Sequence, residues 1–382
     1  MKSLDKRWAI EKMKVALIHD YLCEYGGAER VVEALHEIFP NAPLYTAYYS
    51  PKGLGIHANK FKDWDIRSSW LQQIPFANKL ISPFRILAPM IFEGFDLNGF
   101  DVIISSCSIY FSKAIITKPQ SLHISYIHTP PRYLYGYATS FNYKKWFITK
   151  VVGELLNHFL RIYDFETSQR PDILVANSEN VRKRIQKFYR RDSVVIYPPV
   201  DLTEFKLQKG KQNYYLVLSR LVRGKGVEVV VEACSRLGLI LKVAGSGPEL
   251  NNLRKIAAKN VEFLGWVSDE ERVKLLSNAK ALIVASEDED FGITSIEAQA
   301  CGTPVIAPAS GGFLETVING KTGLLYGGPG VVTTDALVEP LQRFDDTNHH
   351  INPETLRKNA EKFGKVRFKK EILELIDKNL RK

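Results

Sequence analysis

The sequence of 382 residues has few of the features that mark secreted, membrane-spanning or metal-binding chains. Its four cysteines are scattered without CxxC spacing, which suggests neither a zinc site nor a disulfide framework. No run of 18 apolar residues occurs, so no membrane-spanning helix is expected. Residues 1–14 are charged and contain no apolar stretch of signal-peptide length. We therefore expect an intracellular, reduced and soluble protein, or one that rests on a membrane surface.

Repeats and low-complexity segments are also missing from the sequence. The chain is 45% hydrophobic, 11% aromatic and 25% charged, which excludes a mainly disordered, collagenous or coiled-coil protein. At roughly 150 residues per domain, the length predicts two or three domains. Residues 1–200 hold 26 Lys and Arg against 18 Asp and Glu, whereas residues 201–382 hold 26 against 24. The net charge of +10 therefore belongs mostly to the first half.

Short apolar runs rich in β-formers alternate with helical patterns along almost the whole chain. Because these runs are continuously apolar, they predict α/β domains whose parallel sheets are covered on both faces. The predicted strands are Val15–Ile18, Asp101–Ser105, Leu122–Ile127, Asp172–Ala176, Val194–Tyr197, Tyr214–Ser219, Leu239–Ala244, Val261–Leu264, Ala281–Ala285 and Val305–Ala307.

The alternation breaks between residues 197 and 213. Two consecutive prolines stop a strand there, and the Lys/Gln/Gly stretch that follows has linker composition. We expect one doubly wound domain over residues 1–200 and a second over 201–355, each with ligand sites at the carboxyl ends of its strands. Residues 356–382 are expected to form a C-terminal helix that crosses back to the first domain.

The C-terminal segment has a basic, amphipathic helical pattern that begins at Glu354. Its apolar positions recur at helical spacing, so they predict one buried face. The candidate buried residues are Ile372, Leu373 and Ile376.

The first candidate site is the segment Glu-Asp-Phe-Gly-Ile-Thr-Ser-Ile-Glu at residues 289–297. The preceding strand delivers Glu289 and Gly292 to a loop, and a helix is expected to begin near Ile293 and to carry Glu297. A helix amino terminus presents free N–H groups and partial positive charge, which suit a phosphate. Carboxylates on either side suit hydroxyl groups. An ordinary capped helix with acidic residues near its start would give the same pattern.

Basic side chains follow the strand predicted at residues 214–219. Arg220 stands at the strand end, and Lys225 lies beyond a turn between Gly224 and Gly226. Together they could clamp a diphosphate, arginine as a fork and lysine as a point charge. A solvated basic turn is the plain alternative.

Two further motifs follow strands of the first predicted domain. Gly26 and Gly27 stand between the first strand and its helix, where paired glycines let a ligand approach the backbone closely. A tight turn without a ligand would use the same residues. His128 ends a buried strand and opens the segment His-Thr-Pro-Pro-Arg-Tyr. A lone histidine in that place is more often a hydrogen-bonded part of the scaffold than a catalyst.

Taken together, these segments resemble the retaining GT-B glycosyltransferases of family 4, which include bacterial α-mannosyltransferases. The distinctive part is the Glu-x7-Glu motif from Glu289 to Glu297, which continues as Ala-Gln-Ala-Cys-Gly-Thr-Pro-Val. Arg220 and Lys225 stand at the spacing of the family's phosphate-binding pair, and residues 319–325 look like its turn after the sheet. The resemblance implies the GT-B fold, with two Rossmann-like domains facing each other across a cleft.

The start of the chain carries a narrower resemblance. Residues 19–31, His-Asp-Tyr-Leu-Cys-Glu-Tyr-Gly-Gly-Ala-Glu-Arg-Val, look like the lipopolysaccharide and O-antigen mannosyltransferase branch. The His-Thr-Pro-Pro-Arg-Tyr segment at 128–133 is similar to the same branch. The resemblance implies that Gly26 and Gly27 let the first domain close on the sugar and phosphates. It places His128 near the sugar and the reacting centre, as the best catalytic candidate.

For the second domain the resemblance implies a donor site. Glu297 would bind the ribose hydroxyls, and Glu289 would face the hydroxyls of the donor sugar. Arg220 and Lys225 would neutralise the diphosphate leaving group, whose charge grows in the transition state. Backbone N–H groups near the loop and helix start would touch the sugar and the diphosphate. The residues that carry those N–H groups are Phe291, Gly292 and Ile293.

The resemblance implies chemistry without a cofactor or a divalent metal. Asp-x-Asp spacing, which metal-dependent glycosyltransferases use, occurs at 63–65 and 288–290, but neither segment favours metal binding. No carboxylate nucleophile of the retaining-glycosidase kind is evident. In related enzymes a front-face mechanism is favoured, in which the departing phosphate acts as base on the acceptor hydroxyl, so no residue is named as a general base.

The acceptor is expected to bind the first domain. Residues 41–160 hold 12 Lys and Arg against 6 Asp and Glu. Within them, residues 70–81 and 83–92 interleave aromatic, aliphatic and basic side chains. Such segments can rest on an anionic membrane, although buried helices with basic edges would look the same. We expect a polyprenyl-diphosphate-linked glycan acceptor and a peripheral position on the cytoplasmic face of the inner membrane.

The predicted activity is transfer of mannose from GDP-mannose to a lipid-linked glycan during synthesis of an O-antigen-like surface polysaccharide. A UDP-sugar donor, N-acetylglucosamine or glucose, is the alternative, because users of both bases share the Glu-x7-Glu motif. An inactive scaffold that binds sugar nucleotides is a further alternative. Nucleic acid is not an expected partner. The basic run 182–191 looks like the exposed face of a helix capped by Ser178, and no known recognition motif accompanies it.

Overall fold

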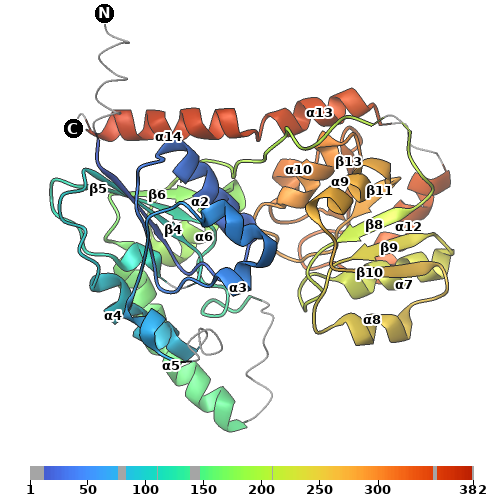
Figure 1. Cartoon of the computed structure of the whole chain (residues 1–382). Coiled ribbons are helices and arrows are strands. Elements are labelled where there is room, and N and C mark those ends of the chain that lie inside the picture. Colours follow the sequence, from blue (N-terminus) through green and yellow to red (C-terminus); the bar gives the residue numbers. More distant parts are fainter. Residues whose placement is uncertain are drawn as a thin grey trace, which may run out of the picture. The chain divides into compact units, whose positions relative to one another are not determined.

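The computed structural model describes residues 13–75, 83–109, 111–137, 147–208, 210–346 and 351–380 (Figure 1). The chain divides into two compact units between Tyr197 and Pro198, and the residues from Lys369 onward group with the first unit. Each unit is built around one parallel sheet.

The sheet of the first unit has seven strands in the order β3-β2-β1-β4-β5-β6-β7. All of its strand pairs are parallel, and every residue of β1 and β4 is buried, as expected for a sheet covered on both faces. The order reverses between β1 and β4, which is where such sheets bind ligands at the carboxyl ends of their strands. The strands are β1 (Val15–His19), β2 (Leu44–Thr46), β3 (Ile66–Ser68), β4 (Val102–Cys107), β5 (Leu122–Ile127), β6 (Ile173–Ala176) and β7 (Val194–Val195).

Helices connect these strands and cover the sheet of the first unit (Figure 1). Their starts follow from local chemistry: the Ser178 hydroxyl accepts the Val181 N–H at 3.1 Å, so that α6 begins at the residue after this cap. The helices are α2 (Gly27–Ile38), α3 (Pro51–Leu54), α4 (Ala88–Glu93), α5 (Phe147–Ser168) and α6 (Glu179–Tyr189). Short 3-10 helices are η1 (Gly55–Phe61), η2 (Trp70–Gln73), η4 (Pro83–Leu87) and η5 (Ser112–Ala114).

The sheet of the second unit has six parallel strands in the order β10-β9-β8-β11-β12-β13. Numbered from its own first strand, this is again the order 3-2-1-4-5-6 of a dinucleotide-binding sheet. The strands are β8 (Tyr215–Leu218), β9 (Leu241–Ala244), β10 (Val261–Gly265), β11 (Ala281–Ile283), β12 (Val305–Pro308) and β13 (Gly323–Tyr326). The helices are α7 (Val227–Leu237), α8 (Leu250–Ile256), α9 (Asp269–Asn278), α10 (Ile293–Ala300), α11 (Phe313–Thr316), α12 (Thr334–Asp346), α13 (Pro353–Glu361) and α14 (Lys365–Leu380).

The two doubly wound parallel sheets confirm the predicted α/β class, and each predicted strand is present. The short strands β2, β3 and β13 were not predicted, because three or four residues give too little pattern to count. The expectation that residues 319–325 form a turn after the sheet is wrong in part. Gly323–Tyr326 pairs with β12 and forms the last strand of the sheet.

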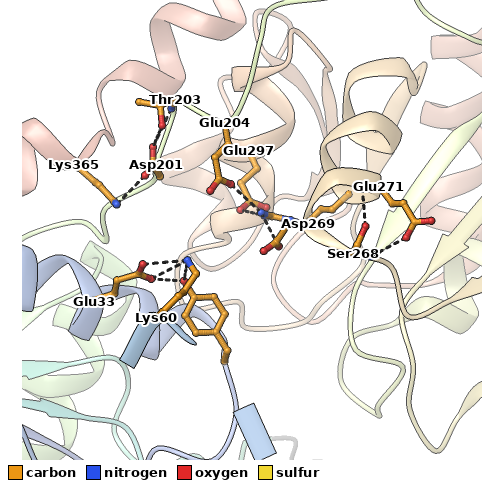
Figure 2. A network of polar contacts seen from close by, with 12 residues as sticks. Glu33, Lys60, Asp201, Thr203, Glu204, Ser268, Asp269, Glu271, Glu297 and Lys365 are labelled. Atoms are coloured by element: carbon orange, nitrogen blue, oxygen red, sulfur yellow. Dashed lines mark hydrogen bonds and ion pairs between the residues drawn. The ribbon is translucent and has the colours of Figure 1, made fainter. Parts of the chain in front are cut away.

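The C-terminal segment is two helices rather than the single helix expected. α13 and α14 are separated at residues 362–364, where the Val200 N–H donates to the Phe363 carbonyl at 2.9 Å. Lys365, at the start of α14, pairs with Asp201 at 2.8 Å (Figure 2). Ile372 and Ile376 are buried as predicted, whereas Leu373 is only half-buried.

Candidate active site

The predicted donor residues of the second unit lie in two loops that leave neighbouring strands and at the start of helix α10, which follows the second loop. β8 and β11 pair in parallel, so their carboxyl ends meet at the same edge of the sheet. The loop after β8 and the loop after β11 touch: the Ser286 hydroxyl donates to the Gly224 carbonyl at 3.3 Å. A Cβ on Gly226 would lie 2.0 Å from the carbonyl oxygen of Ala285, and Gly226 has φ 63°. This glycine therefore sets how closely the two loops approach.

Lys225 and Glu289 meet where these loops touch. The Lys225 ammonium donates to the Glu289 carboxylate at 2.7 Å, and both side chains remain partly accessible, at 29% and 18%. Arg220 is exposed in the loop after β8. A cation and a carboxylate thus stand together at the switch point of the sheet, which is where a sugar diphosphate would need one of each.

Helix α10 begins at Ile293, as predicted, and carries Glu297 in its second turn. Gly292 caps the helix with φ 88°, a left-handed conformation that suits glycine. Phe291 is buried, and its ring packs edge-on against the ring of Phe363 at 5.4 Å. The Phe291 side chain therefore anchors the loop, and only its backbone is available to a ligand.

Gly311 and Gly312, a pair that the sequence analysis did not single out, pack against the loop that carries Glu289. The Gly312 N–H donates to the Glu289 carbonyl at 2.8 Å, and a Cβ on Gly312 would lie 2.5 Å from the Phe291 Cα. Gly311 approaches the Glu289 backbone in the same way. The signal was present: a Gly-Gly pair lies in the loop that follows a buried strand, as it does at Gly26 and Gly27.

Glu297 is held by an arginine from a different helix. The Arg272 guanidinium on α9 hydrogen-bonds and ion-pairs with the Glu297 carboxylate, and the two side chains are only 11% and 3% exposed. Arg272 also pairs with Asp269 at 3.2 Å and with Glu204 at 3.5 Å. Figure 2 shows these three carboxylates converging on one point. Sequence reasoning missed Arg272, because no local pattern links it to a residue 25 positions away.

A buried hydroxyl lies in the first turn of α10. Ser295 is 0% exposed, and its Oγ has no hydrogen-bond partner among the residues that the structure describes. A buried hydroxyl without a partner loses free energy relative to water, so such groups are uncommon unless a ligand or solvent completes them. The start of α10 therefore offers N–H groups and a hydroxyl to a bound anion.

In the first unit, His128 belongs to a buried chain of polar side chains at the switch point between β1 and β4. Its Nε2 lies 2.8 Å from the Ser106 hydroxyl, and the His19 Nδ1 lies 3.2 Å from the same oxygen. The His19 Nε2 in turn lies 3.2 Å from the Glu29 carboxylate. The other Glu29 oxygen accepts the Gly26 N–H at 2.8 Å, so the chain reaches the glycine pair.

The environment shifts the pKa values of the two histidines in opposite directions. Burial, with the nearby charge of His19, lowers the pKa of His128 to about 4, so His128 is neutral at physiological pH. Burial alone would lower the pKa of His19, but the hydrogen bond and charge of Glu29 raise it above its ordinary value. Burial would raise the pKa of Glu29, but His19 holds it below its usual range. The pairing of His19 with Glu29 thus favours the charged form of both side chains, whereas the neighbouring His128 is neutral.

Asp20 follows His19 and fixes the loop after β4. Its carboxylate accepts the backbone N–H groups of Ser108 and Ile109, each at 2.7 Å, and of Ser112 at 2.9 Å. Gly26 has an extended backbone and Gly27 opens α2, so neither needs positive φ. A Cβ on Gly26 would lie 3.4 Å from a Glu29 carboxylate oxygen, so this glycine lets the carboxylate approach the backbone.

The basic run 182–191 does not lie wholly on an exposed face, which corrects the expectation. Arg184 is only 5% exposed, and its guanidinium donates to the Thr129 hydroxyl at 3.0 Å, next to His128. It also stacks over the Tyr137 ring at 4.3 Å. Arg184 therefore supports the loop that follows β5.

The two segments expected to rest on a membrane are mixed in exposure. Trp70 is 40% exposed, and residues 76–81 of the first segment lie outside the described residues. In the second segment, Ile86 and Met90 are exposed, while Ile91 and Phe92 are buried. Across the described ranges, no helix has the length and apolar character needed to cross a membrane. In the same ranges, no three His, Cys, Asp or Glu residues are grouped so as to hold a metal ion.

Family models match the chain in two consecutive parts. Residues 25–204 match Glycosyltransferase Family 4, and residues 200–363 match Glycosyl transferases group 1. An uncharacterized glycosyltransferase of Methanocaldococcus jannaschii is 30% identical over 158 residues, which are 40% of this chain and 45% of that protein. A GDP-mannose-dependent alpha-(1-6)-phosphatidylinositol monomannoside mannosyltransferase of Mycobacterium tuberculosis is 36% identical over 150 residues, 35% of this chain and 39% of that protein. These alignments thus span less than half the length of the curated relatives.

Solved structures show the same fold over nearly the whole chain. The sucrose-phosphate synthase of Thermosynechococcus elongatus superposes with a TM-score of 0.70 at 20% identity, covering 96% of this chain and 99% of that one. HepE of Anabaena, solved in complex with UDP, superposes with a TM-score of 0.68 at 16% identity, covering 96% and 100%. With the two sheets described above, these likenesses confirm the GT-B fold.

Proposed function

Because residues 25–204 belong to glycosyltransferase family 4 and residues 200–363 to the group 1 glycosyl transferases, we propose that the chain is a retaining hexosyltransferase. The proposed donor is GDP-mannose, and the acceptor is a polyprenyl-diphosphate-linked glycan of surface polysaccharide synthesis. The mannosyltransferase relative of Mycobacterium tuberculosis supports this donor. UDP-sugars are the second candidate, because HepE of Anabaena was solved with UDP and with UDP-glucose.

One observation carries the proposal: Lys225 and Glu289 are joined at 2.7 Å at the switch point, where α10 begins. Transfer breaks the bond between the anomeric carbon and the diphosphate, so negative charge grows on the leaving group. Arg220, Lys225 and the N–H groups at Ile293 oppose that charge. When no ligand is bound, Glu289 is the counter-ion of Lys225. When the donor binds, the Glu289 carboxylate accepts hydrogen bonds from hydroxyl groups of the sugar.

Glu297 is proposed to accept the ribose hydroxyls of the nucleotide. Its carboxylate is buried and fixed by Arg272, so little motion is lost when a ribose binds. The Ser295 hydroxyl, unpaired among the described residues, is available to the same ligand.

His128 is proposed to act as a neutral hydrogen-bonding group at the sugar. A neutral imidazole that accepts a hydrogen bond from the Ser106 hydroxyl at Nε2 carries its proton at Nδ1, where it can donate a hydrogen bond to a sugar hydroxyl. We assign no carboxylate nucleophile. The departing diphosphate takes the proton of the attacking acceptor hydroxyl, which attacks from the same face, so the configuration is retained.

No divalent metal is included in the proposal, since arginine, lysine and the helix start supply the positive charge. Chelation with EDTA should leave transfer unchanged. Loss of activity that Mg²⁺ or Mn²⁺ restores would contradict this part. The protein is further proposed to work on the cytoplasmic face of the inner membrane, where a lipid-linked acceptor would be met.

A thermal-shift panel tests the donor. Ligand at 100 times its Kd should stabilise the protein by about 2.7 kcal/mol. GDP and GDP-mannose are expected to raise Tm, and a rise with UDP and UDP-glucose alone would overturn the mannosyl assignment. Lys225→Ala should abolish the shift. Lys242→Ala is the matched control, because Lys242 is 28% exposed in the same unit and also pairs with a glutamate, at 3.8 Å. Equal shifts in both variants would contradict the site.

A further inference from the structure

Helix α5 has the reverse of the usual polarity of a surface helix, with polar side chains toward the domain and apolar side chains toward solvent. Its buried residues are polar: Asp164, Thr167 and Ser168 are 0% exposed, and Asn157 is 7% exposed. Most of its exposed residues are large and apolar, and the exposed polar ones among the described side chains are His158 and Glu166. The apolar ones are Val151 at 52%, Val152 at 51%, Leu155 at 59%, Leu156 at 38%, Phe159 at 61%, Ile162 at 51% and Phe165 at 37%.

Specific contacts fix this orientation. The Lys113 ammonium pairs with the Asp164 carboxylate, and both side chains are fully buried. The Tyr135 hydroxyl donates to the same carboxylate at 2.7 Å, and the Tyr189 hydroxyl donates at 3.2 Å. Rotating α5 to bury its apolar face would expel Asp164 and leave Lys113 buried without its carboxylate, which is costly. The apolar face must therefore point outward.

The outward face is mainly apolar. At about 100° per residue, the seven exposed apolar positions cover about half of the helix circumference. From Val151 to Ile162 they extend for ~17 Å along the axis. On the same spacing, the charged residues Glu154 and Arg161 fall along one edge of this face, and His158 and Glu166 fall within it. Such an exposed apolar surface is unusual in a protein that meets only water.

A neighbouring element adds apolar side chains. Helix α4 packs beside α5, since the Arg170 guanidinium pairs with Glu93 at 2.7 Å and the Tyr163 hydroxyl donates to Glu93 at 3.4 Å (Figure 1). On α4 and the preceding 3-10 helix, Met90 is 63% exposed and Ile86 is 50% exposed.

We propose that the outward face of α5 is a docking surface for an anionic membrane, in which the helix lies in the plane of the interface. A stripe of ~17 Å is too short to span a hydrocarbon core of about 30 Å, but it suits shallow insertion. The first half of the chain has a positive balance, with 26 Lys and Arg against 18 Asp and Glu over residues 1–200. A net positive charge on the unit that carries this apolar helix face matches anionic head groups.

A second copy of the chain fits this face less well than a membrane does. In a symmetric dimer the same patch would meet itself, so two units of net positive charge would be brought together. The inference rests on the proposed function only in that a lipid-linked acceptor would be reached at a membrane. Vesicle binding is measured without donor or acceptor, so it stands or falls separately from glycosyl transfer.

Flotation with vesicles of phosphatidylcholine, with and without phosphatidylglycerol, tests the proposal on the full chain. The wild type should float with the anionic vesicles, and the double variant Leu155→Glu/Phe159→Glu should bind at least about tenfold less. Ile240→Glu/Ile256→Glu is the matched control, since it places two glutamates at exposed isoleucines of the second unit. This control should float like the wild type.

Several results would overturn the proposal. These are equal loss of flotation in both double variants, equal binding to neutral and anionic vesicles, no binding at all, or a concentration-dependent dimer that the α5 variant makes monomeric. Nucleotide thermal shifts and circular dichroism check that each variant is folded. If the double variant does not fold, Phe159→Ala carries the test, because it deletes only an outward-facing ring. It should still weaken vesicle binding.

Discussion

The pair of Arg272 and Glu297 allows a quantitative test of the second unit. Arg272→Ala would leave the Glu297 carboxylate, which is 3% exposed, without its cation. Breaking a buried ion pair from one side costs about 3–5 kcal/mol, because the remaining charge stays desolvated. The other two partners of Arg272, Glu204 and Asp269, are 48% and 43% exposed, so water replaces the arginine there at little cost.

The matched control is Arg236→Ala in the same unit. Arg236 pairs with Asp335 at 2.7 Å, but these side chains are 56% and 87% exposed, so the loss should stay below about 1 kcal/mol. For a unit of this size, each kcal/mol lowers Tm by about 2–4 °C. Differential scanning fluorimetry should therefore show a fall of at least about 6 °C for Arg272→Ala. The fall for Arg236→Ala should be at most about 4 °C.

Adding Glu297→Gln to Arg272→Ala separates lost charge compensation from lost packing. The glutamine removes the uncompensated charge, so the double variant should recover part of the stability that the single variant loses. The reasoning is refuted if Arg272→Ala is no less stable than Arg236→Ala, or if the second substitution lowers Tm further.

Three other predictions concern the glycines at the ends of α7 in the second unit and the buried polar side chains around His128 in the first. Gly226→Ala and Gly238→Ala both place a Cβ at positive φ at opposite ends of α7, which costs roughly 1–2 kcal/mol each. Only Gly226→Ala should also lose the nucleotide-induced thermal shift, since its Cβ would meet the Ala285 carbonyl, whereas Gly238 has nothing within 4 Å; equal effects would refute this. The raised pKa of His19 stabilises the fold fully below its unfolded pKa of about 6.5, and this stabilisation is lost as the pH rises through the folded pKa. His19→Gln should therefore cost more in urea unfolding at pH 5.5 than at pH 9, and a cost that does not vary with pH would contradict the pairing. Ser106→Ala should lower the transfer rate about tenfold, equivalent to ~1.4 kcal/mol, without changing the nucleotide thermal shift, because it frees the His128 ring to turn; an unchanged rate would show that Ser106 does not position His128.

The strands and the start of α10 were predictable from sequence, because short, continuously apolar runs and a helix start carry local signals. β1 and β12 are buried at each position, so their runs have no polar interruption. Gly292 and Ile293 mark a helix start by residue type alone. The Glu-x7-Glu spacing likewise locates Glu289 and Glu297 without knowledge of their neighbours.

What could not be predicted depends on contacts between distant segments. Arg272 reaches Glu297 from another helix, and the Glu289–Lys225 contact spans 64 positions. The outward face of α5 was missed for a different reason. An apolar stripe at helical spacing predicts a buried face, and only the pairing of Asp164 with Lys113 reverses which side is inside. In the same way, the break at residues 362–364 depends on the backbone of Val200, which no helical pattern in the C-terminal segment announces.

The polar inner face of α5 bears on which attachments survive in a fatty environment. A helix held to its domain by apolar packing alone has little to lose when hydrocarbon offers the same kind of contact. The Asp164 carboxylate forms an ion pair with Lys113 and accepts hydrogen bonds from Tyr135 and Tyr189. Lipid tails carry no polar groups that could replace these contacts. Detergent or acyl chains could therefore contact the outer face of α5, but they could not replace the polar contacts of its inner face. The buried ion pair and hydrogen bonds at Asp164 would hold the helix to its domain in an apolar environment as well as in water.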